Sequence, residues 1–147
     1  MIWESVGKEL TRSDIDGFAL RYGDALPPEV EKLLRRINGG VPGSDLSVPV
    51  DDPNDPEAEI KGIYGIGHSL EHLDLEDYLE IISEDSRFEG LWPIGYDPFG
   101  GPFVYVVDNQ KRGEIRFVPD DQMDLDSPQS YRVAKNMDEF IKLLGLG

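Results

Sequence analysis

Residues 91–118 constrain the fold more than any other part of the chain, because three short apolar runs alternate there with clusters of turn-forming residues. The runs are rich in the β-branched and aromatic side chains that favour strands. They are residues 91–96, 103–107 and 114–118. Consecutive strands joined by such short connections pair as hairpins, so a mainly antiparallel sheet is predicted. Its candidate core residues are Trp92, Ile94, Val104 and Val106.

The glycines between the first two runs raise the question of a phosphate-binding loop. Gly95 and Gly100 have the spacing of such a loop, but Gly101 and Pro102 stand where a lysine and a serine or threonine are needed. A dinucleotide-binding loop would open a helix, whereas a strand is predicted to follow here. We therefore interpret residues 97–102 as a turn between two strands.

Helical patterns precede these strands. Residues 14–22 are predicted to form a helix that Ser13 caps, Gly23 ends, and Ile15 and Phe18 anchor in the core, with Leu20 or Tyr22 as further candidates. A second helix begins at Pro27 and Pro28 and ends at Asn38-Gly39-Gly40, which tolerate the left-handed conformation. Its apolar face follows helical spacing and comprises Val30, Leu33, Leu34 and Ile37.

Two further helices are predicted in the middle and at the C-terminus. Asp74 can cap a helix over residues 75–84, and Asn136, with Glu139 three positions on, can cap the last one after a strand at 131–134. The apolar residues of the last helix are Met137, Phe140, Ile141 and Leu144. Helices at the N-terminus, middle and C-terminus around an antiparallel sheet indicate a single α+β domain over residues 1–147.

The region between the second and third helices is harder to assign. Residues 41–59 are rich in Pro, Gly and Asp and are expected to form an exposed loop. Residues 60–66 alternate loosely as a strand, in which Gly62 and Gly65 predict a bulge or a close approach of the backbone.

Negative charge is the strongest global signal. The chain has 30 acidic and 14 basic residues, and residues 37–110 hold 16 acids against only Lys61 and Arg87. Such a chain repels nucleic acid and anionic membranes, so neither is expected as a direct partner. The acids form either a solvated surface or a face that attracts a cationic partner. The candidate partner-binding residues are Asp51, Asp52, Asp55, Glu57, Glu59, Glu71, Asp74, Glu76, Asp77, Glu80, Glu84 and Asp85.

Several kinds of site find no support in the sequence. Without cysteine there is no disulfide or thiolate site, and the absence of a long apolar stretch or signal-like N-terminus leads us to expect a soluble cytoplasmic protein. His68-Ser69-Leu70-Glu71-His72 matches the H-x-x-E-H pattern of some zinc peptidases, but a third ligand is not apparent. We expect no catalytic residue, metal or cofactor.

The order of these elements resembles the SUKH superfamily, the Smi/Knr homology group, over residues 10–145. The segments that carry the resemblance are LTRSDIDGFALRYGDALPPEVEKLLRRINGG, IYGIG, LWPIGYDPFGGPFVYVVD, GEIRFVPDD and YRVAKNMDEFIKLL. The resemblance implies an α+β domain without enzymatic activity. It also implies a role as a bacterial immunity protein, which binds and blocks a toxin made by the same cell.

Three hypotheses about function follow. The leading one is a non-enzymatic immunity protein that binds a cognate polymorphic toxin, possibly a nuclease, through its acidic residues. The toxin would then present a basic surface. An alternative is an interaction or scaffold module in regulation, unrelated to toxins. A third is a small metal enzyme that uses His68 and His72.

Overall fold

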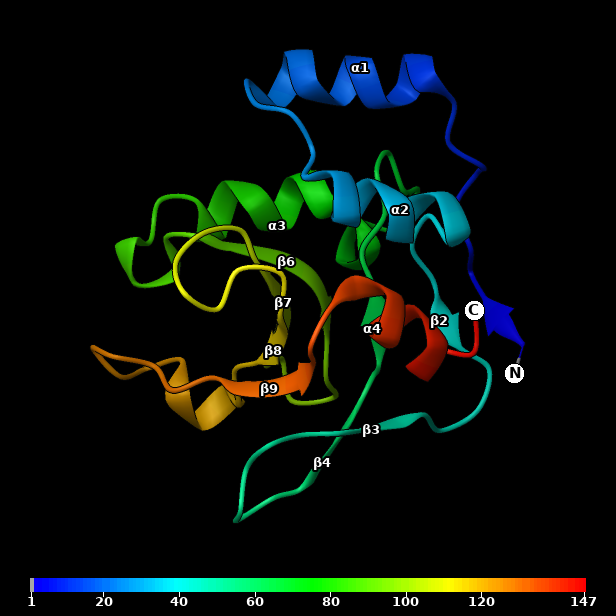
Figure 1. The fold of residues 1–147 in the computed structure, drawn as a ribbon. Coiled ribbons are helices and arrows are strands. Elements are labelled where there is room, and N and C mark those ends of the chain that lie inside the picture. The colour runs from blue at the N-terminus through cyan, green and yellow to red at the C-terminus, as the bar shows by residue number, and fades with distance from the viewer. Residues whose placement is uncertain (1) are drawn as a thin grey trace.

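An antiparallel sheet of five strands forms the centre of a computed structural model of the chain, which describes residues 2–147 (Figure 1). The strands lie side by side in chain order. They are β5 (Gly62–Ile63), β6 (Leu91–Tyr96), β7 (Pro102–Val106), β8 (Ile115–Phe117) and β9 (Tyr131–Ala134). The structure thus confirms the α+β fold with a mainly antiparallel sheet, and the predicted bounds of β6 and β9 are correct.

The β6–β7 hairpin confirms the interpretation of the glycine-rich segment as a turn. Asp97 Oδ1 accepts hydrogen bonds from the backbone N–H groups of Phe99, at 3.0 Å, and Gly101, at 2.7 Å. A Cβ atom on Gly101 would lie 2.6 Å from the Val118 carbonyl oxygen, so a side chain does not fit there. All four predicted core residues of the hairpin, Trp92, Ile94, Val104 and Val106, are buried.

The first helix, α1 (Arg12–Tyr22), starts earlier than predicted because Thr11, and not Ser13, is its cap. Thr11 Oγ1 accepts from the Asp14 N–H while the Asp14 carboxylate accepts from the Thr11 N–H, which is a capping box. Gly23 ends the helix in the left-handed conformation, as predicted. Phe18 is buried, whereas Leu20 is exposed.

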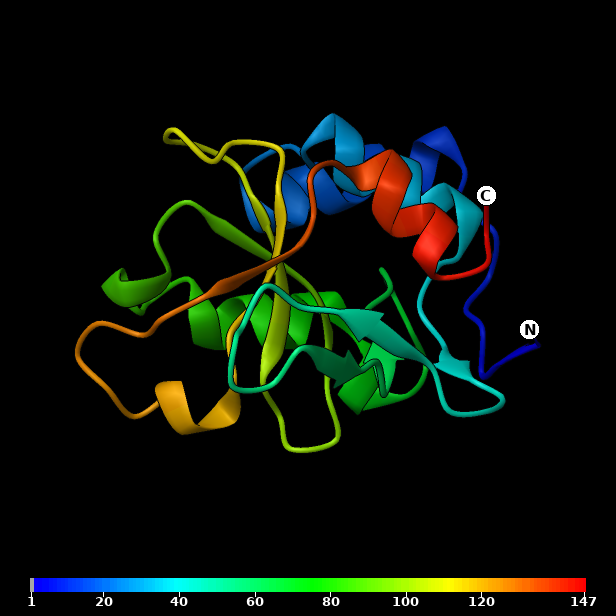
Figure 2. The same cartoon turned by 60° about the horizontal axis from the view of Figure 1, so that its bottom comes forward.

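The second helix, α2 (Pro28–Arg36), matches its prediction closely. Val30, Leu33 and Leu34 are buried, and Gly39 adopts a positive φ of 77° just beyond the helix end. The last helix, α4 (Met137–Leu143), packs against α2 and β9, and Asn136 Oδ1 accepts from the Glu139 N–H as its cap. Figure 2 shows α1, α2 and α4 gathered on one side of the molecule.

The middle helix, α3 (Leu75–Ile82), packs against β6 and is capped by the Asp74 side chain, as predicted. Leu75, Leu79 and Ile82 face the core, which forms one continuous cluster with residues of the sheet and the other helices. Three short 3₁₀ helices complete the helical segments: η1 (Glu71–Leu73), η2 (Ser86–Phe88) and η3 (Asp120–Gln122).

Residues 41–59 are not simply a loop. They contribute β2 (Val41–Pro42), which pairs with β1 (Trp3–Glu4), and the hairpin of β3 (Ser47–Pro49) and β4 (Glu57–Glu59). The predicted loop is confined to residues 43–46, between β2 and β3, and to the hairpin tip, residues 50–56. The β3–β4 hairpin lies on the side of the molecule opposite α1 (Figure 1).

The strand predicted at 60–66 is reduced to the two residues of β5. The expected close approach of the backbone is correct at both glycines. A Cβ atom would lie 2.6 Å from the Tyr96 hydroxyl oxygen at Gly62 and 2.4 Å from the Asn38 carbonyl oxygen at Gly65. At Gly62 and Gly65 the backbone therefore lies too close to its neighbours for an added side chain to fit without a shift.

Candidate functional site

A cavity of about 460 Å³ lies between the β3–β4 hairpin and the turn that follows β6. Carboxylates line it from three separate segments: the hairpin, the β6–β7 turn and η3. None of the described residues that line it is Lys or Arg. We call it the acidic cavity, and its carboxylates are Asp52, Asp55, Glu57, Glu59, Asp97, Asp120 and Asp121.

The register of the β3–β4 hairpin sets the direction of its acids. Val48 pairs with Ala58, and both are buried, so the strand alternation turns Glu57 and Glu59 to the other side. The tip is held by two backbone hydrogen bonds, one from the Val50 N–H to the Pro56 carbonyl and one from the Asp51 N–H to the Arg132 carbonyl. The acidic residues of the hairpin therefore lie on an element that backbone hydrogen bonds hold in place.

Asp97 is the most buried carboxylate of the acidic cavity, with 8% of its surface exposed. Burial raises the pKa of its carboxyl group, and the charge of Asp120 adds to the rise, although the N–H groups of Phe99 and Gly101 oppose it. An ionised carboxylate at this position is costly for the fold, and it concentrates negative charge at the floor of the cavity.

An apolar side chain stands among these acids. Phe99 also lines the acidic cavity, and 77% of its surface is exposed. Phe99 therefore adds an exposed apolar side chain to the carboxylates of this cavity.

The second group of predicted acids lies on and around α3, and some of its members have partners within the chain. Asp74 caps α3, Glu76 forms two hydrogen bonds with the Arg21 guanidinium, and Asp85 pairs with Arg87 at 2.7 Å. The other four are exposed and form no ion pair with a residue of the described range: Glu71, Asp77, Glu80 and Glu84.

A second cavity, of about 730 Å³, lies at the other end of the β6–β7 hairpin, where β6 begins and β7 ends. Glu84 and Asp85 line this cavity, which shares no lining residue with the acidic cavity. We call it the aromatic cavity after Tyr22, Phe88, Trp92 and Tyr105. The structure thus brings Asp52, Asp55, Glu57 and Glu59 together, whereas Asp51 does not line the acidic cavity and the α3 acids lie elsewhere.

The two histidines form no metal site in the described chain. His68 is buried: its Nε2 lies 2.6 Å from the Ser5 carbonyl oxygen and its Nδ1 accepts from the Leu70 N–H, so both ring nitrogens are engaged. His72 is exposed on η1. Within residues 2–147, no group of three His, Asp or Glu side chains is arranged to hold a metal ion.

Comparison with known families gives one match. The family model of the SMI1 / KNR4 family (SUKH-1) matches residues 9–143, from just before α1 to the end of α4. The chain belongs to the SMI1/KNR4 family (SUKH-1). The match confirms the resemblance stated from the sequence. SUKH proteins are known as immunity proteins of toxin systems.

No curated protein and no solved structure matches this SUKH-1 chain. In the part of the chain that the structure describes, no helix has the length and apolar character needed to cross a membrane.

Sequence reasoning did not place Asp97, Phe99, Asp120 and Asp121 at the candidate site of this SUKH-1 domain. Asp120 and Asp121 are adjacent in the sequence, but no sequence pattern indicates that they lie near the hairpin about sixty residues earlier. The order of the strands brings them together, because β8 ends and β9 begins beside the β6–β7 turn.

Proposed function

We propose that this chain is an immunity protein that binds a cognate toxin and neutralises it through the acidic cavity. The observation that carries the proposal is the gathering of seven carboxylates, with no Lys or Arg among the described lining residues, in a member of the SUKH-1 family. It acts by binding and not by catalysis, and it protects the cytoplasm of the cell that makes the toxin.

A toxin that cleaves nucleic acid fits this surface best. A nuclease binds phosphate groups through cationic side chains, so an acidic surface of matching shape can occupy the same site. Charge attraction between two such surfaces raises the association rate, by roughly 10- to 1,000-fold at low salt.

The hairpin acids are ready to meet such a partner. None of the four that line the acidic cavity, Asp52, Asp55, Glu57 and Glu59, forms an ion pair with another described residue, so no internal pair has to break when a cation binds. The backbone bonds at the hairpin tip reduce the ordering that binding requires. Phe99 supplies an apolar contact beside the charges.

The exposed α3 acids Glu71, Asp77, Glu80 and Glu84 form a second candidate surface. Ile81, which is 75% exposed, stands among them as Phe99 does at the acidic cavity. Two other acids near α3, Glu76 and Asp85, already form ion pairs with Arg21 and Arg87. We therefore assign this surface the secondary role.

Co-expression with a toxin tests the proposal. The toxin to be tested is a C-terminal toxin domain of a secreted protein, sought in the reading frame beside this chain's gene, and cell growth is measured with and without the chain. The cavity variant carries D52N, D55N, E57Q and E59Q. A matched variant removes four exposed carboxylates that line neither cavity: E4Q, E9Q, D16N and D108N.

We expect the matched variant to protect cells as the parent chain does, and the cavity variant to lose protection and to associate more slowly with the purified toxin domain at low salt. Equal protection by both variants would overturn the assignment of the acidic cavity. A chain that neither rescues growth nor binds the domain would favour the regulatory interaction module.

A further inference from the structure

The aromatic cavity has the size and lining of a ligand site. Its volume of about 730 Å³ falls within the range of pockets that hold small molecules or short peptide segments. It is bounded by the end of α3, the residues of η2, the segment 24–27 with the first two residues of α2, and the paired strands β6 and β7.

The apolar wall of this cavity is held by the core. Trp92 and Tyr105 face each other across β6 and β7, and Phe88 is buried beside them. Tyr22 from α1 packs edge-on against the Trp92 ring, with ring centroids 5.6 Å apart and planes at 76°. An aromatic wall fixed in this way offers apolar contact without further ordering on binding.

The wall also holds an unpaired hydrogen-bond donor. Trp92 is 7% exposed, and its Nε1–H group is buried without a hydrogen-bond partner in residues 2–147. A buried donor without an acceptor costs free energy, and buried indole N–H groups ordinarily find one. With less than 1 Å² of accessible surface, this N–H group does not open onto the cavity, but its resonance can report changes in the aromatic wall around it.

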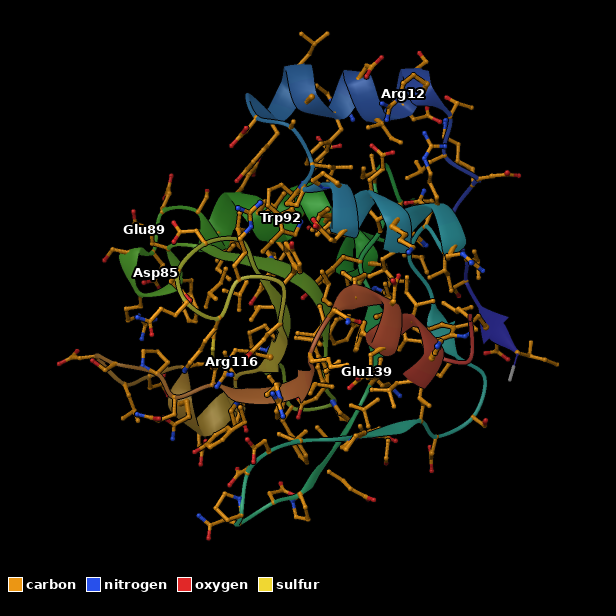
Figure 3. All side chains as sticks on the ribbon, viewed as in Figure 1. Arg12, Asp85, Glu89, Trp92, Arg116 and Glu139 are labelled. Atoms are coloured by element: carbon orange, nitrogen blue, oxygen red, sulfur yellow. The ribbon has the colours of Figure 1, made fainter. Side chains whose placement is uncertain are left out.

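The charged residues around the cavity favour an occupant with a positive charge. Five carboxylates line it against one cation, Arg112. Asp85 is engaged by Arg87, and Glu29 accepts a hydrogen bond from the Tyr105 hydroxyl, whose pKa is raised to about 12 by burial and by this contact. Asp85 and Glu89 lie close together on the segment between α3 and β6 (Figure 3). The carboxylates are Asp24, Glu29, Glu84, Asp85 and Glu89.

We propose that the aromatic cavity binds a peptide segment in which a large apolar side chain stands next to a basic one. The apolar side chain contacts the aromatic wall, and the basic side chain meets Glu84 and Glu89. The two cavities share no residue, so this site stands whether or not the acidic cavity binds a toxin.

Nuclear magnetic resonance of the ¹⁵N-labelled full chain tests this site. The probe is acetyl-Leu-Arg-amide, and two comparison probes lack one feature each: acetyl-Gly-Arg-amide has no apolar side chain, and acetyl-Leu-Glu-amide reverses the charge. We expect the first probe to give a saturable shift of the Trp92 indole N–H resonance. The Trp3 indole N–H, which is also buried and unpaired, lies outside the cavity and should not move.

Two double variants test how much the carboxylates of the cavity contribute to binding. E84Q with E89Q should weaken binding of acetyl-Leu-Arg-amide roughly two- to tenfold, while the control E71Q with E80Q, two exposed acids outside the cavity, should leave it unchanged.

Three results would overturn the proposal: no saturable shift of the Trp92 indole, an equal shift with acetyl-Leu-Glu-amide, or equal weakening by the E71Q/E80Q control. Loss of toxin binding in the acidic-cavity variant has no bearing on these readouts, so failure at one site is distinguishable from failure at the other.

Discussion

Asn38 and Ile66 exchange two hydrogen bonds in the interior of the protein: Asn38 Oδ1 accepts from the Ile66 N–H at 2.7 Å, and Asn38 Nδ2 donates to the Ile66 carbonyl at 3.1 Å. The same Nδ2 donates to the Lys8 carbonyl at 3.0 Å. One side chain, 3% exposed, thereby joins the end of α2, the chain after β5 and the segment that leads to α1.

Replacing this side chain should strongly destabilise the fold. In N38A the backbone N–H and carbonyl of Ile66 would remain buried without partners, and we expect the free energy of unfolding to fall by about 2–4 kcal/mol. Urea denaturation followed by circular dichroism measures the change. The control N54A alters an exposed loop residue and should stay within about 0.5 kcal/mol of the parent. Equal effects of the two changes would refute the structural role of Asn38.

His68 provides a second tie to the N-terminal segment. Because its ring bonds to the Ser5 carbonyl and the Leu70 N–H, H68A should lower the free energy of unfolding by roughly 1–3 kcal/mol, and H72A should have little effect. Added Zn²⁺ should not raise the melting temperature of the parent chain above that of H72A. A zinc-dependent rise that needs both histidines would instead support a metal site.

The sequence predicted these elements with uneven success, and the reasons are physical. Turn and helix signals are local, so β6, the turn at Asp97 and the core face of α2 were correct. The β3–β4 hairpin was missed because each strand buries a single residue, Val48 or Ala58, which leaves no periodicity to detect. Thr11 and Ser13 can both cap a helix, and only the bond between Asp14 and the Thr11 N–H decides between them.

The candidate site could be predicted only in part for a similar reason. The acids of the hairpin and of α3 stand out in the sequence as one acidic stretch, but the fold separates them into two places. Asp97 and Asp120 join the hairpin acids only through the pairing of the sheet strands. The structural role of the Asn38 side chain likewise could not be predicted, because its two partner residues, Lys8 and Ile66, lie far from it in the sequence.

Two glycine changes should have opposite effects on stability. Gly17 lies inside α1, where an added Cβ would approach only Arg21 Nη1, at 3.2 Å, and not the two nitrogens that bond to Glu76, so G17A should raise the free energy of unfolding by about 0.5–1 kcal/mol. G65A places a methyl group 2.4 Å from the Asn38 carbonyl oxygen and should lower it by about 2 kcal/mol or more. Thermal denaturation of both variants checks the two signs, and a tolerated G65A would contradict the close approach.

Asp97 should make stability depend on pH in a defined direction. Its pKa is raised in the folded chain, so the folded state holds a proton that the unfolded state has released. The corresponding stability is fully present below the pKa of the unfolded chain, 3.8, and is lost as the pH rises through the folded pKa. Above the folded pKa, the ionised and buried carboxylate therefore weakens the fold.

Two substitutions at Asp97 separate charge from hydrogen bonding. D97N keeps an oxygen for the N–H groups of Phe99 and Gly101 but removes the charge, so at pH 7 it should melt higher than the parent, with a difference that shrinks towards pH 4. D97A removes the acceptor and should cost about 1–3 kcal/mol at both pH values. A D97N variant less stable than the parent at pH 7 would refute the assignment of the cost to charge. If the acidic cavity binds a basic toxin, D97N should also slow association, because the charge that weakens the fold is part of the field that attracts the partner.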